Sequence, residues 1–87
     1  MTIRQELKMV VGELWTAISK TDATTSTAEI VDGAKTWKVT AERIYRHRAV
    51  RTAWSPCYFL TTPEGERLGG YGRATSFVDW AVRRITA

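Results

Sequence analysis

The order of the predicted elements indicates a two-layer α+β fold, in which a four-stranded antiparallel sheet packs on two helices. Apolar residues recur at helical spacing near both ends of the chain, over residues 3–18 and 77–85. Between them lie two turn signals, at Asp32–Gly33 and at residues 63–66, each flanked by short stretches that suit β-strands. The predicted order is therefore α-β-β-β-β-α within a single domain, residues 1–87.

The first helix is predicted over residues 2–19. Thr2 can act as its N-cap, and Gln5, three residues further on, completes a capping box. Gly12 lies inside this helix, where glycine costs about 1 kcal/mol relative to alanine. The apolar positions that share one face are Ile3, Leu7, Val10, Val11, Leu14 and Ile18.

A polar connector over residues 20–27 ("KTDATTST") leads from this helix to the first predicted hairpin. Asp32–Gly33 suits a type I′ turn, in which both central residues need a positive φ. Trp37 and Val39 alternate after the turn, so we expect them to share one face of the second strand.

The next stretch, residues 42–51 ("ERIYRHRAVR"), fits two kinds of secondary structure. As a strand it places Arg46 and Arg48 on one face, whereas as a helix it aligns Tyr45 with the alanines four residues before and after it. We predict a strand to about residue 46, followed by an exposed loop. A shorter sheet with residues 40–50 helical is the alternative.

The second hairpin is predicted over residues 57–71. "CYFLTT" forms a compact apolar strand, "PEGE" supplies Pro63 and Gly65 for a turn, and "RLGGYG" returns. Ser76 then suits the N-cap of a final helix, with Asp79 in the capping-box position. The buried stripe of this helix is predicted to contain Phe77, Trp80, Ala81 and Ile85, and Arg83 and Arg84 lie at its C-terminal end, where the helix dipole favours cations.

The positive charge lies in the second half of the chain. Residues 1–40 carry five basic and five acidic residues, whereas residues 41–87 carry eight arginines and four acidic residues, which accounts for the whole net charge of +4. Four of these eight arginines fall within residues 42–51. This asymmetry favours a partner with an acidic or polyanionic surface.

The chain lacks a recognisable catalytic constellation. Its only thiol, Cys57, and its only imidazole, His47, would have to meet across strands to form a nucleophile–base pair. The commoner explanation is that Cys57 is a small core residue and His47 a surface residue. One cysteine and one histidine cannot build a structural zinc site, and no acidic cluster has calcium-loop spacing. The sequence therefore predicts a non-enzymatic protein with no cofactor, no metal and no small-molecule substrate.

A glycine-rich segment precedes the final helix. In "GGYGR", residues 69–73, backbone N–H groups and Arg73 could hold an anion at the helix N-terminus. The segment lacks the Gly-Lys-Ser/Thr ending of a P-loop, and the favoured explanation of the glycines is a strand that must bend before a tight strand-to-helix turn.

The arginine-rich stretch is the predicted contact surface. Arginines beside aromatic rings suit the backbone and bases of a nucleic acid, and Arg, Trp and Tyr also dominate protein–protein interfaces. A solvated arginine face with no partner is the commonest explanation of such a run, followed by a protein interface and then by nucleic acid. The predicted partner-binding residues are Arg43, Tyr45, Arg46, Arg48, Arg51 and Trp54, with Arg67 and Arg73 as secondary basic candidates.

Two resemblances bear on function. Residues 57–82, "CYFLTTPEGERLGGYGRATSFVDWAV", resemble the strand–turn–strand–helix unit of integrase arm-binding domains, whose sheet enters the DNA major groove. In size and style, the chain resembles the anti-CRISPR proteins, small phage-encoded inhibitors that occlude a nuclease or guide complex. This second resemblance implies a phage or mobile-element inhibitor that docks on a larger protein or ribonucleoprotein, and the alternative is a DNA- or RNA-binding module that uses residues 43–51.

The expected location is the cytoplasm of a bacterial host cell. A single cysteine allows no intramolecular disulfide, so a disulfide-stapled secreted scaffold is not expected. The N-terminus has no apolar signal region, and no apolar run approaches the length of a membrane span. We therefore expect no membrane partner.

Overall fold

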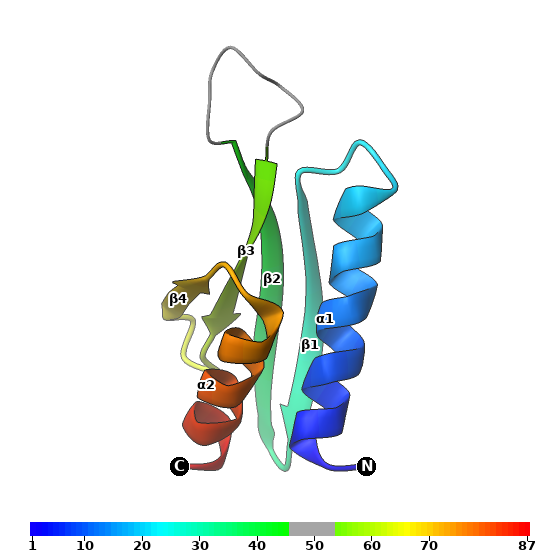
Figure 1. Ribbon diagram of the computed structural model, residues 1–87. Helices are drawn as coiled ribbons and strands as arrows, with labels where there is room; N and C mark the ends of the chain where they lie inside the picture. The colour runs from blue at the N-terminus through cyan, green and yellow to red at the C-terminus, as the bar shows by residue number, and fades with distance from the viewer. Residues whose placement is uncertain (46–53) are drawn as a thin grey trace.

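The computed structural model describes residues 1–45 and 54–87 and confirms the predicted α+β fold. The strands form one antiparallel sheet in the order β1-β2-β3-β4, and both helices pack on the same face of it (Figure 1). The elements in chain order are α1 (Ile3–Ser19), β1 (Thr25–Asp32), β2 (Lys35–Tyr45), β3 (Trp54–Thr61), β4 (Arg67–Tyr71) and α2 (Ala74–Thr86).

Alternation along the strands separates a buried face from an open one. On β2, Trp37, Val39 and Ala41 are buried beneath the helices, whereas Thr40 and Glu42 lie on the other face. A sheet of this kind commonly packs one face on the core and leaves the other to water. The largest fully buried side chains are Phe77, Leu7, Ile18, Ile30, Leu60 and Val39.

The start of α1 forms as the sequence predicts. Thr2 is the N-cap, its hydroxyl accepts a hydrogen bond from the Gln5 N–H, and the Gln5 side chain accepts one from the Thr2 N–H. This reciprocal capping box satisfies two of the N–H groups that the first turn leaves without helical partners. The predicted boundaries and capping residues of this helix are thus confirmed.

The turn between β1 and β2 differs from the predicted type I′ turn on Asp32–Gly33. Asp32 pairs with Lys35, so the central residues are Gly33 and Ala34, and only Gly33 has a positive φ, of 63°. A positive φ confined to a first central glycine is the pattern of a type II′ turn. The physical reason lies in the core: this register sets Ile30 opposite Trp37, whereas the predicted turn would have set it opposite Lys35.

The start of α2 is a second correction. The helix begins at Ala74 with Arg73 as its N-cap, and Arg73 makes no side-chain capping bond, so Ser76 is not the cap. Asp79, expected in a capping box, instead pairs with Arg4 of α1. The predicted burial of Phe77 is confirmed, and its ring packs against Tyr58 and Tyr71 at centroid distances of 5.7 and 6.4 Å.

Candidate partner-binding surface

Arg43 joins the sheet to the end of α1. The last turn of α1 contains no basic residue, and Lys20 follows it with no glycine cap. The guanidinium of Arg43 reaches from β2 to these carbonyls: its Nε donates to the Ile18 oxygen at 2.8 Å, and its Nη2 donates to Ile18 and, at 2.5 Å, to Thr21. A cation here satisfies free carbonyls and complements the negative end of the helix dipole.

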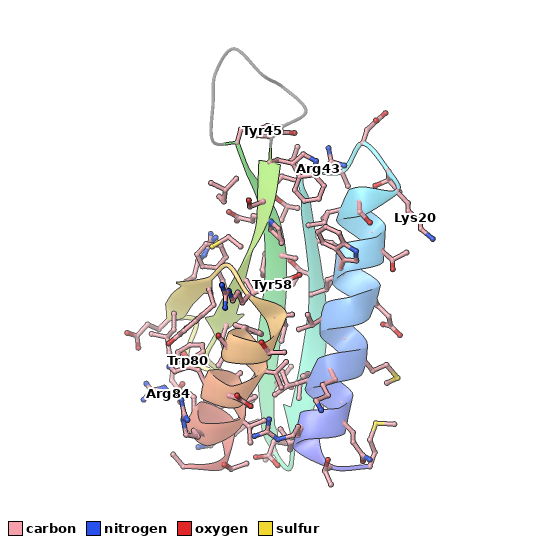
Figure 2. All side chains as sticks on the ribbon, in the orientation of Figure 1. Lys20, Arg43, Tyr45, Tyr58, Trp80 and Arg84 are labelled. Carbon is pink, nitrogen blue, oxygen red and sulfur yellow. The ribbon has the colours of Figure 1, made fainter. Side chains whose placement is uncertain are left out.

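Aromatic rings cover the other side of this guanidinium. The Arg43 Cζ lies 4.8 Å from the Trp54 ring centroid, and Trp54 packs against Trp15 of α1 at 5.4 Å with an interplanar angle of 39°. Tyr45 is the cross-strand neighbour of Trp54. Figure 2 shows Arg43 and Tyr45 together at the end of the sheet beside the C-terminal end of α1.

This end of the molecule exposes apolar surface. Trp15, Ile44 and Tyr45 are 43%, 45% and 46% exposed, and they make up half of the six large hydrophobic side chains that are exposed among the described residues. We call the surface formed by Trp15, Arg43, Tyr45 and Trp54 the aromatic end; Ile44, between Arg43 and Tyr45 on β2, points to the open face of the sheet. Rigid aromatic rings beside an anchored guanidinium are typical of the residues that dominate protein interfaces.

The six predicted partner-binding residues fall into two groups. Arg43, Tyr45 and Trp54 come together at the aromatic end. Arg46, Arg48 and Arg51 lie outside the described residues, as does the predicted loop before Trp54.

Trp15 belongs to the aromatic end but was missed as a contact residue. The available signal was its position outside the apolar stripe of the first helix, which leaves a large ring without a place in the core. A tryptophan that lies off the buried face of an amphipathic helix needs another partner, and here Trp54 supplies it.

The secondary candidates Arg67 and Arg73 lie elsewhere. Arg67 is on the open face of the sheet, where its Nη2 donates to Glu42 at 2.6 Å and its Cζ lies 3.7 Å from the Phe59 ring centroid. Arg73 is exposed at the start of α2. The structure therefore does not bring these two arginines into the aromatic end.

The environment of Cys57 does not favour a reactive thiolate. Burial raises the pKa of its thiol, and the negative charge of Glu42 raises it further, while Arg67 and a backbone hydrogen bond oppose these effects. A nucleophilic cysteine needs the opposite shift. His47, the base considered for a Cys–His pair, lies outside the described residues.

A groove lies between the two helices. It has a volume of about 300 Å³, with Val11, Ala74 and Val78 among its lining residues. Arg4 and Asp79 form an ion pair there, and the hydrogen bond from Arg4 lowers the pKa of Asp79. A carboxylate held in its ionised form is a poor proton donor at neutral pH.

Within residues 1–45 and 54–87, no three potential metal-ligating side chains converge. No helix in this part of the chain combines the length and apolar character needed to cross a membrane. Comparisons with protein-family models, with curated proteins and with solved structures yield no match. The chain's own surface must therefore support any functional proposal.

Proposed function

We propose that this chain is a non-enzymatic binding protein that docks on a larger protein or ribonucleoprotein through its aromatic end. The observation that carries the proposal is the exposure of Trp15 and Tyr45 next to the anchored guanidinium of Arg43. An exposed ring that is already held by packing, as Trp15 is by Trp54, loses little conformational freedom on binding, so its burial contributes more of its free energy to affinity. Among the described residues, Trp15 and Tyr45 are the aromatic residues that are exposed and not partly or fully buried.

The arrangement of the arginines favours a protein target over free nucleic acid. A phosphate contact requires a guanidinium with unused donors, yet Arg43 is bonded to backbone carbonyls and Arg67 is paired with Glu42. Two of the eight predicted contact residues are thus largely occupied within the molecule. Anchored arginines that stack on aromatic rings suit a protein interface instead.

In its finer form, the proposal is an inhibitor of the anti-CRISPR type, encoded by a phage or mobile element and active in the bacterial host cytoplasm. A net charge of +4 rules out mimicry of DNA and favours an acidic patch of a defence nuclease or the exposed backbone of a bound guide. Docking of this kind blocks the target by occlusion and requires no catalytic residue. The chain's small size supports this mode, since 87 residues provide one core and one or two surfaces.

An interference assay tests this function. Bacteria with an active CRISPR–Cas system are transformed with a targeted plasmid, with and without expression of the protein. We expect the wild type to restore transformation and Tyr45→Ala to reduce the effect at least tenfold, the size that loss of one interface anchor produces. Met9→Ala is the matched control, because Met9 is 48% exposed but lies on α1 away from the aromatic end.

Two results would overturn parts of the proposal. If the wild type leaves transformation unchanged in hosts that carry the major types of CRISPR system, the inhibitor form is wrong. If Tyr45→Ala and Met9→Ala both retain full effect, the aromatic end is not the contact surface, even if the inhibitor function stands.

Nucleic-acid binding remains the alternative that uses residues 43–51, and a salt titration separates it from protein docking. If Arg46, Arg48 and Arg51 each neutralise one phosphate, log K for duplex DNA should fall with log salt at a slope of about −2.7. We expect no measurable binding of duplex or single-stranded DNA above 0.1 M salt. Tight binding with that slope would favour the nucleic-acid module.

A further inference from the structure

The two edges of the sheet differ in how well they are protected. At one edge, β4 has five residues, includes Gly69 and Gly70, and pairs with β3 through an irregular register near Tyr58 and Phe59. β1 lies at the other edge (Figure 1). It has eight residues, pairs with β2 without a bulge and contains no proline, lysine or arginine, and Glu29 is its one charged residue before the terminal Asp32. Proteins usually protect an edge strand with one of these features, because an open edge is a template for another strand.

The register identifies the backbone groups that β1 leaves free. The Arg43 N–H donates to the Thr24 oxygen at 2.9 Å, so position 24 is bonded toward β2. Hydrogen-bonded positions alternate along an antiparallel pair. The backbone N–H and C=O groups of the even-numbered residues of β1 therefore point toward β2, and those of the odd-numbered residues point away from the sheet edge. The residues whose backbone groups point outward are Thr25, Thr27, Glu29 and Val31. All four residues are also exposed to solvent.

We propose that two copies of this chain pair through β1 and form one continuous eight-stranded antiparallel sheet. The fitting register is symmetric, with Ala28 of one copy opposite Ala28 of the other. Thr27 then pairs with Glu29, and Thr25 with Val31, on both sides of the twofold axis. In this register every outward-facing residue of one strand meets an outward-facing residue of the other, which satisfies all the free N–H and C=O groups of both strands.

The side chains of β1 suit a second copy of the same strand. On the open face, the Thr27 hydroxyl lies opposite the Glu29 carboxylate, and Val31, which is 59% exposed, lies opposite Thr25. On the helix face, Ser26 lies opposite Ile30. In this register no two like charges are directly opposed. In the next symmetric register, Glu29 of one copy would lie opposite Glu29 of the other, and the two carboxylates would repel each other.

Such a dimer has a defined consequence for the proposed function. The antiparallel twofold arrangement points the two aromatic ends in opposite directions, and the described residues of one copy already extend 44 Å. Both ends therefore cannot reach one compact patch of a single target. This consequence depends on the proposed function, whereas the dimer itself does not.

Mass and amide exchange test the pairing directly. We expect the full chain, 9.8 kDa as a monomer, to approach twice that mass in light scattering as its concentration rises. Over the same range, amide exchange at Thr25, Thr27, Glu29 and Val31 should slow at least tenfold, while Ser26, Ala28 and Ile30 change little. A chain that stays monomeric at millimolar concentration, or a dimer without this odd–even pattern, overturns the proposal.

A pair of charge variants tests the register. Thr27→Glu sets two like-charge pairs across the interface and should weaken dimerisation roughly 2- to 30-fold, whereas Thr27→Lys sets two opposite-charge pairs and should strengthen it by a similar factor. Both variants lose the same 3.2 Å hydroxyl contact with Thr40, so they are matched as monomers. Thr36→Glu, one strand inside the edge, is the control and should leave dimerisation unchanged. Equal effects of the two Thr27 variants would show that the register is wrong.

Discussion

Two arginines of the sheet stack on aromatic rings, one on each face. Arg43 lies over Trp54 at 4.8 Å on the helix-covered face, and Arg67 lies over Phe59 at 3.7 Å on the open face. Glu42 and Arg43 are neighbours along β2 and point to opposite faces, so Glu42 pairs with Arg67 while Arg43 reaches α1. Both arginines stack on an aromatic ring, but Arg67 connects two strands of the sheet whereas Arg43 connects the sheet to α1.

The difference between them lies in the acceptors. Arg67 on β4 reaches across β3 to the Glu42 carboxylate on β2, and its side chain is 50% exposed, so water can replace the contacts it makes. Arg43 donates hydrogen bonds to backbone carbonyls at the C-terminal end of α1, whose last turn contains no basic residue of its own. A short distance to a ring is therefore a poorer guide to energetic importance than the groups that lose their partner when the arginine is removed.

Arg43→Ala should have the largest effect. It removes charge-assisted bonds to Ile18 and Thr21 and the cover on Trp54, so we expect a loss of about 2–3 kcal/mol in the free energy of unfolding. Urea unfolding followed by tryptophan fluorescence measures it. Arg43→Lys keeps the charge but not the planar fork and should recover only part of the loss. If Arg43→Ala costs no more than Arg67→Ala, the contrast between the two arginines fails.

Gly70→Ala should disturb the packing of Cys57 and Phe59 on the open face of the sheet. A Cβ at position 70 would lie 2.5 Å from the Cys57 Sγ and 2.8 Å from the Phe59 Cε1, so both side chains would have to move. We expect a loss of about 1–2 kcal/mol from this overpacking, again in urea. Gly12→Ala is the control, because a Cβ there meets nothing within 4 Å, and it should stabilise the helix slightly. A Gly70→Ala protein as stable as the wild type would show that the Phe59 ring has room to shift.

Arg67→Ala should have a smaller effect. Its ion pair with Glu42 and its stack on Phe59 are both solvent-exposed contacts, so together they should contribute about 1 kcal/mol or less. The part due to Glu42 should shrink as salt is added. Thermal unfolding of the variant and the wild type at low and high salt measures both terms. A difference that does not shrink with added salt would mean that the stack, not the ion pair, is the main contribution.

The sequence predicted those parts of the fold that depend on neighbouring residues. The capping box of α1 and the buried stripe of α2 are local patterns. The box is confirmed, and so is the burial of Phe77, Ala81 and Ile85, whereas Trp80 is only partly buried and Val78 is buried in its place. The turn type failed because it depends on which β2 residue faces Ile30, and the α2 cap failed because Asp79 has a partner on α1. Register and cross-element pairing are tertiary choices that local periodicity does not contain.

The same limit applies to the candidate site. Arg43 was grouped with its neighbouring arginines as a partner contact, because proximity along the chain was the only available measure. Its acceptor Ile18 lies 25 residues away, and no local signal connects the two. Tyr45 and Trp54 were predicted together only because both adjoin the arginine-rich stretch. Their cross-strand pairing was not predicted, because Trp54 was expected at the end of a loop and β3 begins there instead of at residue 57.

The ion pair of Arg4 and Asp79 should have the smallest effect, and its pH dependence distinguishes it from the Arg43 contacts. The hydrogen bond from Arg4 is the main reason that the pKa of Asp79 is lowered in the folded protein. The ion pair therefore stabilises the folded protein at pH values above the pKa that Asp79 has in the unfolded chain. This stabilisation is lost as the pH falls through the lower pKa that Asp79 has in the folded protein, from about pH 4 downward. We expect the difference in Tm between wild type and Asp79→Asn to vanish there. Carbonyl oxygens do not titrate, so the deficit of Arg43→Ala should persist over the same range, and its loss on acidification would contradict the assignment of Ile18 and Thr21 as the acceptors that matter.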